Sequence, residues 1–110
     1  MKIIIQPIGK DINNNILNLL YDIISMEFNI INVTIAPILK IDIPNYINRQ
    51  GNQLRSSDLL HWILKIIKPT IEMKILVICN MDAYSGELNF VFGEAHLGGR
   101  IAAIYLPRLR

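Results

Sequence analysis

Apolar and polar residues recur along the chain with a helical spacing in two segments. In residues 11–28, isoleucine and leucine return every three or four positions, with asparagine, aspartate and serine between them. This spacing puts the apolar side chains on one face of a helix. Residues 56–67 repeat the pattern, and Pro69 follows their end. We expect Asp11 to cap the first helix, and Ser56 or Ser57 to cap the second.

Shorter segments rich in β-branched residues are predicted to be strands. Several of them are nearly continuous apolar runs, which is typical of strands buried on both faces of a sheet. In chain order they are residues 2–7, 29–35, 74–80, 88–95 and 100–106. Residues 44–55 are rich in Asn, Gln, Gly and Arg, and we expect them to form a long loop.

The order of these elements predicts one α/β domain over residues 1–110. Helical segments between the first three strands favour right-handed crossovers and parallel strands. The short connection between the last two strands allows a hairpin, so one of that pair should run antiparallel to the others. The expected architecture is a twisted mixed sheet of five strands with two helices and one antiparallel edge strand.

The composition narrows the class of function. The chain has 11 Lys and Arg against 9 Asp and Glu, a net charge of +2, and this near balance argues against a nucleic-acid-binding module. No apolar run approaches the ~20 residues that cross a membrane as a helix. The single cysteine, Cys79, permits no intrachain disulfide, which fits a reducing cytoplasm. We expect a cytoplasmic protein that binds neither nucleic acid nor a membrane.

Few side chains have the chemistry of a catalytic or metal site. Glu94 and His96 share one face of a predicted strand, but zinc sites usually have three or four protein ligands. His61 lies on a polar helix stripe, and Cys79 is flanked by apolar residues, as a core thiol is. Gly99 belongs to a glycine pair that no predicted helix follows, so we interpret it as a turn and not as a phosphate-binding loop. The residues by themselves predict no catalytic group and no metal site.

The end of the chain resembles the archaemetzincin family of zinc metalloproteases. The pattern N-F-V-F-G-x-A occupies residues 89–95, and G-G-R-x-A-x-x-x-L-x-R-L-R occupies residues 98–110. The opening K-I-I-I-Q-P-I-G is also similar to the start of that family. Looser matches are Tyr46, Arg49, Gln53, Leu54 and Asp82.

This resemblance implies a metzincin-like N-terminal subdomain. Its strands would lie in the spatial order second, first, third, fifth, fourth, with the fourth at an antiparallel edge. In metzincins the edge strand lines the cleft, and a peptide substrate pairs with it through main-chain hydrogen bonds. The substrate-binding residues implied in this way are Asn89, Phe90, Val91, Phe92, Gly93, Glu94 and Ala95.

The family's zinc signature, H-E-x-x-H-x-x-G-x-x-H, does not occur in the 110 residues. The resemblance implies zinc as the cofactor of a complete protein, with histidines binding the metal and the glutamate acting as general base. No catalytic residue can be carried over to this chain. The expected function is therefore the substrate-cleft half of a zinc metalloprotease, inactive alone. Its partners would be a peptide or protein substrate and a missing C-terminal catalytic half.

Another class of function stays open, a stand-alone α/β module that binds a protein through its strand edge or basic end. A regulatory domain that binds a small ligand is a third alternative. The last strand is apolar on both faces, which gives a further expectation. If both helices pack on one face of the sheet, as in metzincins, the other face lacks a cover. The isolated chain should then self-associate, aggregate or bind a hydrophobic dye.

Overall fold

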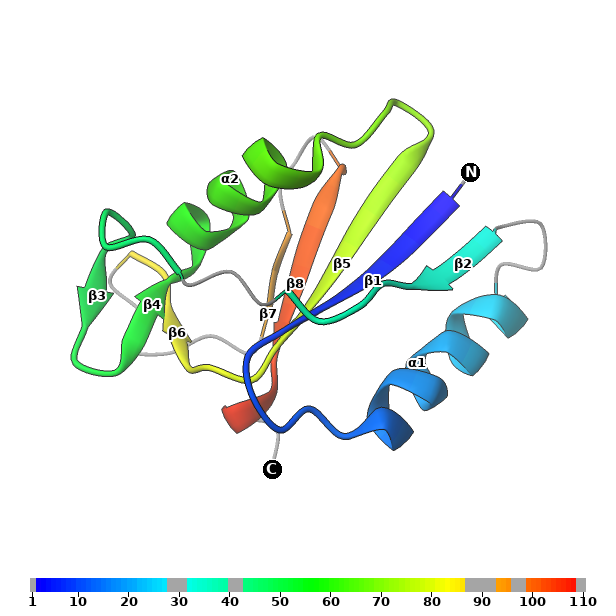
Figure 1. Ribbon diagram of the computed structural model, residues 1–110, viewed down its shortest axis with the longest axis horizontal. Coiled ribbons are helices and arrows are strands. Elements are labelled where there is room, and N and C mark those ends of the chain that lie inside the picture. The colour runs from blue at the N-terminus through cyan, green and yellow to red at the C-terminus, as the bar shows by residue number, and fades with distance from the viewer. Residues whose placement is uncertain (1, 28–31, 40–42, 87–92, 96–98, 109–110) are drawn as a thin grey trace.

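A mixed sheet forms the centre of the molecule (Figure 1). The computed structural model describes residues 2–27, 32–39, 43–86, 93–95 and 99–108. Five strands follow one another in the order β2-β1-β5-β8-β7. Their bounds are Lys2–Ile8 (β1), Asn32–Ile35 (β2), Met73–Cys79 (β5), Gly93–Ala95 (β7) and Ile101–Tyr105 (β8).

The strand order and directions confirm the predicted topology. β1 pairs in parallel with β2 and β5, and β5 pairs in parallel with β8. β7 is antiparallel to β8 and ends the sheet. The described parts of β2 and β7 are shorter than predicted, because residues 29–31 and 88–92 of those two predictions lie outside the described residues.

The two helices, α1 (Asn14–Glu27) and α2 (Ser56–Ile67), cover opposite faces of this sheet (Figure 1). Leu17 of α1 belongs to one apolar core with Ile5 and Ile78. Ile63 of α2 belongs to another core with Val77. The condition that both helices share one face is therefore wrong, and the expectation of self-association loses its basis.

The order of the strands explains this arrangement. From β1 the chain moves to β2 on one side, and from β2 it crosses back over β1 to β5 on the other side. Right-handed crossovers that run in opposite directions place their helices on opposite faces of a sheet. Central-strand residues accordingly alternate between the two cores. The α2 side receives Ile75, Val77, Cys79, Ile101, Ala103 and Tyr105, and the α1 side receives Leu76, Ile78 and Ile104.

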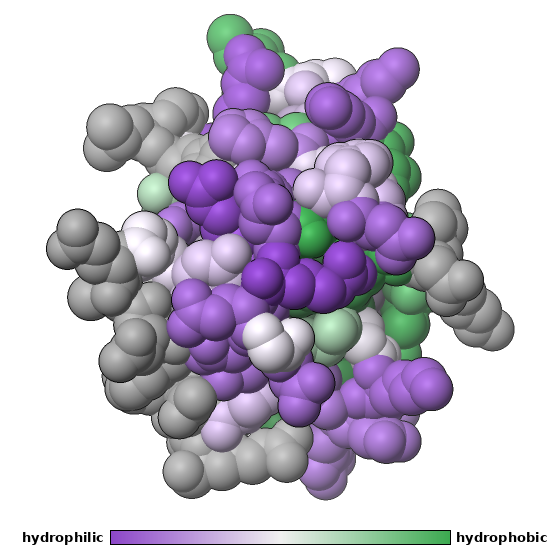
Figure 2. Space-filling view, turned by 90° about the vertical axis from the view of Figure 1, so that its left-hand side faces the viewer, coloured by the Kyte–Doolittle hydropathy of each residue, from purple (hydrophilic) through white to green (hydrophobic). Residues whose placement is uncertain are grey.

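A second sheet has three strands, two of which lie in the predicted long loop of residues 44–55. It consists of β3 (Arg49–Gln50), β4 (Gln53–Arg55) and β6 (Ala83–Tyr84). These strands have two or three residues each, which is too short to produce a recognisable alternation of polar and apolar positions. The side of the molecule that carries this sheet is largely hydrophilic (Figure 2).

Neither helix begins with the expected cap. Asn13 caps α1, because its Oδ1 accepts a hydrogen bond of 2.8 Å from the backbone N–H of Asn15. Asp11 lies in the preceding turn, with a left-handed φ of 59°. At α2 the capping position is Arg55, which makes no side-chain cap hydrogen bond. Ser56 is fully buried in the core instead.

The end of α2 agrees with its prediction. The helix stops at Ile67, and Lys68 follows in the left-handed region with φ 49°. The backbone N–H of Lys68 donates to the Leu64 carbonyl oxygen at 3.1 Å. Among the residues that the structure describes, no helix has the length and apolar character that crossing a membrane requires.

Lys68→Gly should stabilise the protein. A side chain in the left-handed region is strained, whereas glycine adopts this conformation freely. We expect the free energy of unfolding to rise by about 0.5–1 kcal/mol. Lys65→Gly, at an exposed site inside α2, is the matched control and should lower it by about 1 kcal/mol. Urea unfolding measures both, and equal effects of the two substitutions would contradict the assignment.

Candidate functional site

The predicted substrate-binding strand lies at the sheet edge as far as it is described. Gly93, Glu94 and Ala95 form β7, whereas Asn89, Phe90, Val91 and Phe92 lie outside the described residues. Glu94 is opposite Ala103 of β8 in the antiparallel ladder. Within the described part of the chain β7 pairs with β8 alone. Its outer side is thus a place where another strand could add.

Gly93 brings this edge strand unusually close to β8. A Cβ atom added to Gly93 would lie 2.8 Å from the backbone oxygen of Ala103. A side chain of any size would therefore push the two strands apart. The glycine is needed here for space, and not for a left-handed backbone conformation.

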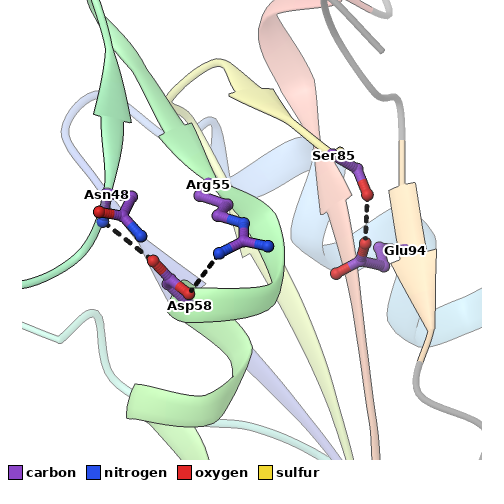
Figure 3. Close-up of polar contacts among 5 residues, drawn as sticks. All are labelled: Asn48, Arg55, Asp58, Ser85 and Glu94. Atoms are coloured by element: carbon purple, nitrogen blue, oxygen red, sulfur yellow. Dashed lines mark hydrogen bonds and ion pairs between the residues drawn. The ribbon is translucent and has the colours of Figure 1, made fainter. Parts of the chain in front are cut away.

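Glu94 connects the edge strand to the small sheet. Its Oε1 accepts a hydrogen bond of 2.9 Å from the Ser85 hydroxyl (Figure 3). Ser85 directly follows β6, so this contact joins the two sheets. The second carboxylate oxygen, Oε2, is buried and has no hydrogen-bond partner among the described residues, an arrangement that would be favourable only with an added donor. Ser85 was not predicted from the sequence, because nothing local marks a contact with a residue on another strand.

A buried polar pair joins the last residue of β8 to the first residue of α2. The hydroxyls of Ser56 and Tyr105 share a hydrogen bond, and both residues are 0% exposed. Burial raises the pKa of Tyr105 well above its ordinary value, and the hydrogen bond from Ser56 opposes this shift. Tyr105 is therefore a neutral phenol at physiological pH. We assign the pair a structural role, in which it joins the start of α2 to the sheet.

A carboxylate fastens the start of α2 to the small sheet. Asp58 Oδ2 accepts a hydrogen bond of 3.0 Å from the backbone N–H of Asn48, and Asp58 Oδ1 lies 3.7 Å from Arg55 Nη1 (Figure 3). The position of Asp58 in the first turn also suits the positive end of the helix dipole. These two contacts fix the segments next to β3 and β4 against the start of α2.

The zinc that the family resemblance implies does not fit the described residues. They contain no group of three His, Cys, Asp or Glu side chains placed to hold a metal. Cys79 is fully buried, and burial raises its pKa to about 11, which disfavours the thiolate that binds metals. His61 is exposed on α2. His96, considered with Glu94 as a ligand pair, lies outside the described residues.

Comparison with known proteins identifies the relatives of this chain. No family model matches it. It is 41% identical over 111 residues to the archaemetzincin of Methanocaldococcus jannaschii, an alignment that covers 100% of this chain and 56% of that protein. It is 34% identical over 109 residues to the archaemetzincin of Archaeoglobus fulgidus, covering 99% and 62%. The chain is thus similar to archaemetzincins over 99–100% of its own length. It spans less than two thirds of the length of these curated relatives.

Solved structures share the fold of this chain. The A. fulgidus archaemetzincin superposes with a TM-score of 0.72 at 29% identity, over 100% of this chain and 63% of that one. The Methanopyrus kandleri archaemetzincin gives a TM-score of 0.77 at 23% identity, over 100% and 60%. A zinc-dependent peptidase of Methanocorpusculum labreanum gives 0.72 at 18% identity, over 97% and 65%. The last two comparisons support the fold alone.

Most of the looser archaemetzincin matches turn out to organise the small sheet. Gln53 Nε2 donates to Asp82 Oδ2 at 3.1 Å, and the backbone N–H of Leu54 donates to the Asp82 carbonyl oxygen at 3.0 Å. Arg49 donates to the carbonyl oxygens of residues 43, 44 and 47 at 3.2–3.4 Å. Tyr46, by contrast, is 63% exposed. All of the looser matches except Tyr46 therefore have a structural role in or beside the small sheet.

Gly93→Ala should loosen the edge strand. The added methyl group would meet the Ala103 carbonyl oxygen, so β7 must shift or detach, and we expect a loss of about 1–3 kcal/mol in the free energy of unfolding. Ala95→Ser, at an exposed position of the same strand, should change it by less than about 0.5 kcal/mol. Amide hydrogen exchange of β7 and β8 with urea unfolding measures both effects. Unchanged exchange in Gly93→Ala would contradict the close approach.

The Ser56–Tyr105 pair can be tested with a double-mutant cycle. Tyr105→Phe leaves the Ser56 hydroxyl buried without its partner, and Ser56→Ala does the same to the Tyr105 hydroxyl. Each should lower the free energy of unfolding by about 1–3 kcal/mol. The double variant should lose less than the sum of the two single losses, because no unpaired hydroxyl remains. Strict additivity in thermal or urea unfolding would show that the two groups do not stabilise each other.

Proposed function

We propose that this chain is the substrate-cleft half of an archaemetzincin-like zinc metallopeptidase. Peptide-bond hydrolysis would belong to a complete protein and not to these 110 residues alone. The observation that carries the proposal is the antiparallel edge strand β7 in a chain homologous to archaemetzincins. The protein would act in the cytoplasm, where the lone Cys79 stays reduced.

A substrate would bind to β7 as an additional strand. Main-chain hydrogen bonds would hold an extended peptide along the edge whatever its sequence, and side-chain contacts would set any preference. Residues 89–95 would form this edge, with Gly93, Glu94 and Ala95 as its described end. Glu94 is turned toward the α2 side, where Ser85 holds it. Among the described residues of β7, Gly93 and Ala95 are those on the opposite face, and their small size would leave room there for bulky substrate side chains.

The missing catalytic half would dock on the α1 side of the sheet, next to the edge. A groove of about 310 Å³ lies there, between α1 and residues of β1, β5, β7 and β8. Its mostly apolar walls include Ile3, Ile24, Lys74, Leu76, Ala95 and Ala102. Docking would bury apolar surface that is only half-buried here, and each Å² covered would stabilise the complex by about 25 cal/mol.

Zinc would be held by that missing half. When bound there it would supply an activated water for attack on the peptide carbonyl. The contribution of this chain would be to orient the extended peptide along β7 and to exclude water from one side of it. Positioning of this kind lowers the barrier because the scissile bond is held near the attacking group.

A chimera tests the proposal. This chain replaces the aligned part of the M. jannaschii archaemetzincin, and the chimera, its parent and the chain alone are assayed on fluorogenic peptides with added zinc. We expect the chimera to cleave the peptides that its parent cleaves. The chain alone should retain no stoichiometric zinc after dialysis and should cleave none. Gly93→Ala in the chimera should raise KM more than it lowers kcat, because the substrate strand is displaced.

Three outcomes would count against the proposal. The first is peptide cleavage by the chain alone. The second is a folded, zinc-loaded chimera that is inactive beside an active parent. The third is a Gly93→Ala chimera with unchanged KM. A Lys65→Gln chimera is the control, because Lys65 is exposed on α2 away from the edge and the groove, and it should behave like the unsubstituted one.

A further inference from the structure

A crevice of about 750 Å³ opens at the C-terminal ends of β1 and β5. Its walls are the loop after β1, the loop after β5 and the segments that flank the small sheet. Pockets that hold small molecules usually have volumes of about 300–1,000 Å³. The crevice is separate from the peptide edge, because β8 lies between β5 and β7.

The position of this crevice follows from the topology. The connections after β1 and β5 leave the sheet on opposite faces, which opens a gap between the strand ends. Asn80 keeps the two loops in place. Its side-chain Nδ2 donates to the Lys10 carbonyl oxygen at 2.6 Å, and its backbone N–H donates to the Ile8 carbonyl oxygen at 3.1 Å. Gly9 permits the turn with φ 103°. The mouth of the crevice is thus preformed.

Charged groups of both signs line the mouth. The Lys10 ammonium is exposed and makes no hydrogen bond or ion pair within the described part of the chain. Arg49 is oriented by three backbone carbonyl oxygens, which leaves two of its five N–H groups for another acceptor. Asp11 adds one negative charge. The three side chains together carry a net charge of +1.

Apart from Gly9 and the polar Asn80, the rest of the lining is apolar. Ile8, Ile38, Leu39, Ile43 and Met81 form the wall behind the charged mouth. A ligand that complements both regions has an apolar body and a single negative charge. A ligand with several negative charges would be repelled more strongly by Asp11. α1 begins three residues after Asp11, but none of its residues lines the crevice.

We infer that the crevice between the ends of β1 and β5 binds a small apolar monocarboxylate, with the carboxylate at Lys10 and Arg49. The apolar tail lies against Ile38, Leu39 and Met81. This site is independent of the proposed peptidase function, because no residue of β7 contributes to it.

Ligand titration followed by amide chemical shifts tests the inference. The probes are hexanoate, its neutral analogue hexanamide, and hexyl phosphate as a more highly charged anion. Hexanoate should shift the amides of Gly9, Lys10 and Asn80, and should bind about fivefold more tightly than hexanamide. In Lys10→Gln this preference should disappear. Lys2→Gln is the matched control and should keep the preference. Lys2 is exposed at the start of β1, whereas Lys10 lies just after its end.

Each other result overturns the inference. Equal binding of hexanoate and hexanamide would show an apolar crevice without anion recognition. Tighter binding of hexyl phosphate would assign the mouth to phosphate. Equal effects of Lys10→Gln and Lys2→Gln would remove Lys10 from the site. Absence of shifts at Gly9 and Asn80 at every soluble concentration of hexanoate would exclude binding. Lys10→Met repeats the test if the glutamine variant is unstable by circular dichroism.

Discussion

The parallel pairing of β1 with neighbours on both sides is the constraint on which the rest of the structure depends. All seven residues of β1 pair with β5, and four of them pair with β2. Because the chain reaches those neighbours by crossovers in opposite directions, handedness places α1 and α2 on opposite faces. The same reversal opens the crevice at the strand ends and leaves β7 at the far edge. Two apolar cores, the crevice and the free edge are thus consequences of one topological choice.

Polar contacts then join the small sheet to this framework. Asp58 holds the start of α2 against Asn48, and Gln53 reaches Asp82 across the small sheet. Glu94 reaches Ser85 from the edge strand. The paired residues are 9 to 29 positions apart in the sequence, and each contact lies at a boundary between elements. Such hydrogen bonds stabilise by only about 0.5–1.5 kcal/mol each. Their main effect is to fix the relative position of elements that apolar packing alone would leave adjustable.

The chain resembles archaemetzincins in its fold but differs from a complete peptidase in the side chains that it contributes. The described residues supply a five-stranded mixed sheet, an edge strand that lies close to β8 at Gly93, and a polar side that carries the small sheet. They supply no set of metal ligands. If one part of the protein positions the substrate and another part binds the metal, catalysis would depend on how the two parts dock. The crevice between the ends of β1 and β5 is separated from β7 by β8, so a ligand bound there would leave the edge strand free.

The sequence by itself determined the five main strands, both helices, the strand order and the candidate edge. Helical periodicity and apolar runs are local signals, and the family resemblance supplied the order that local signals lack. Tertiary structure decided the rest. The strands of the small sheet are too short for a periodic signal. Ser56 does not cap α2, because its hydroxyl is hydrogen-bonded to Tyr105 inside the core. The faces covered by α1 and α2 and the charged mouth at Lys10 and Arg49 depend on segments distant in the chain. The contact of Ser85 with Glu94 depends on how the small sheet lies against the edge strand. Only the folded sheet brings such segments together, so no local pattern could have revealed them.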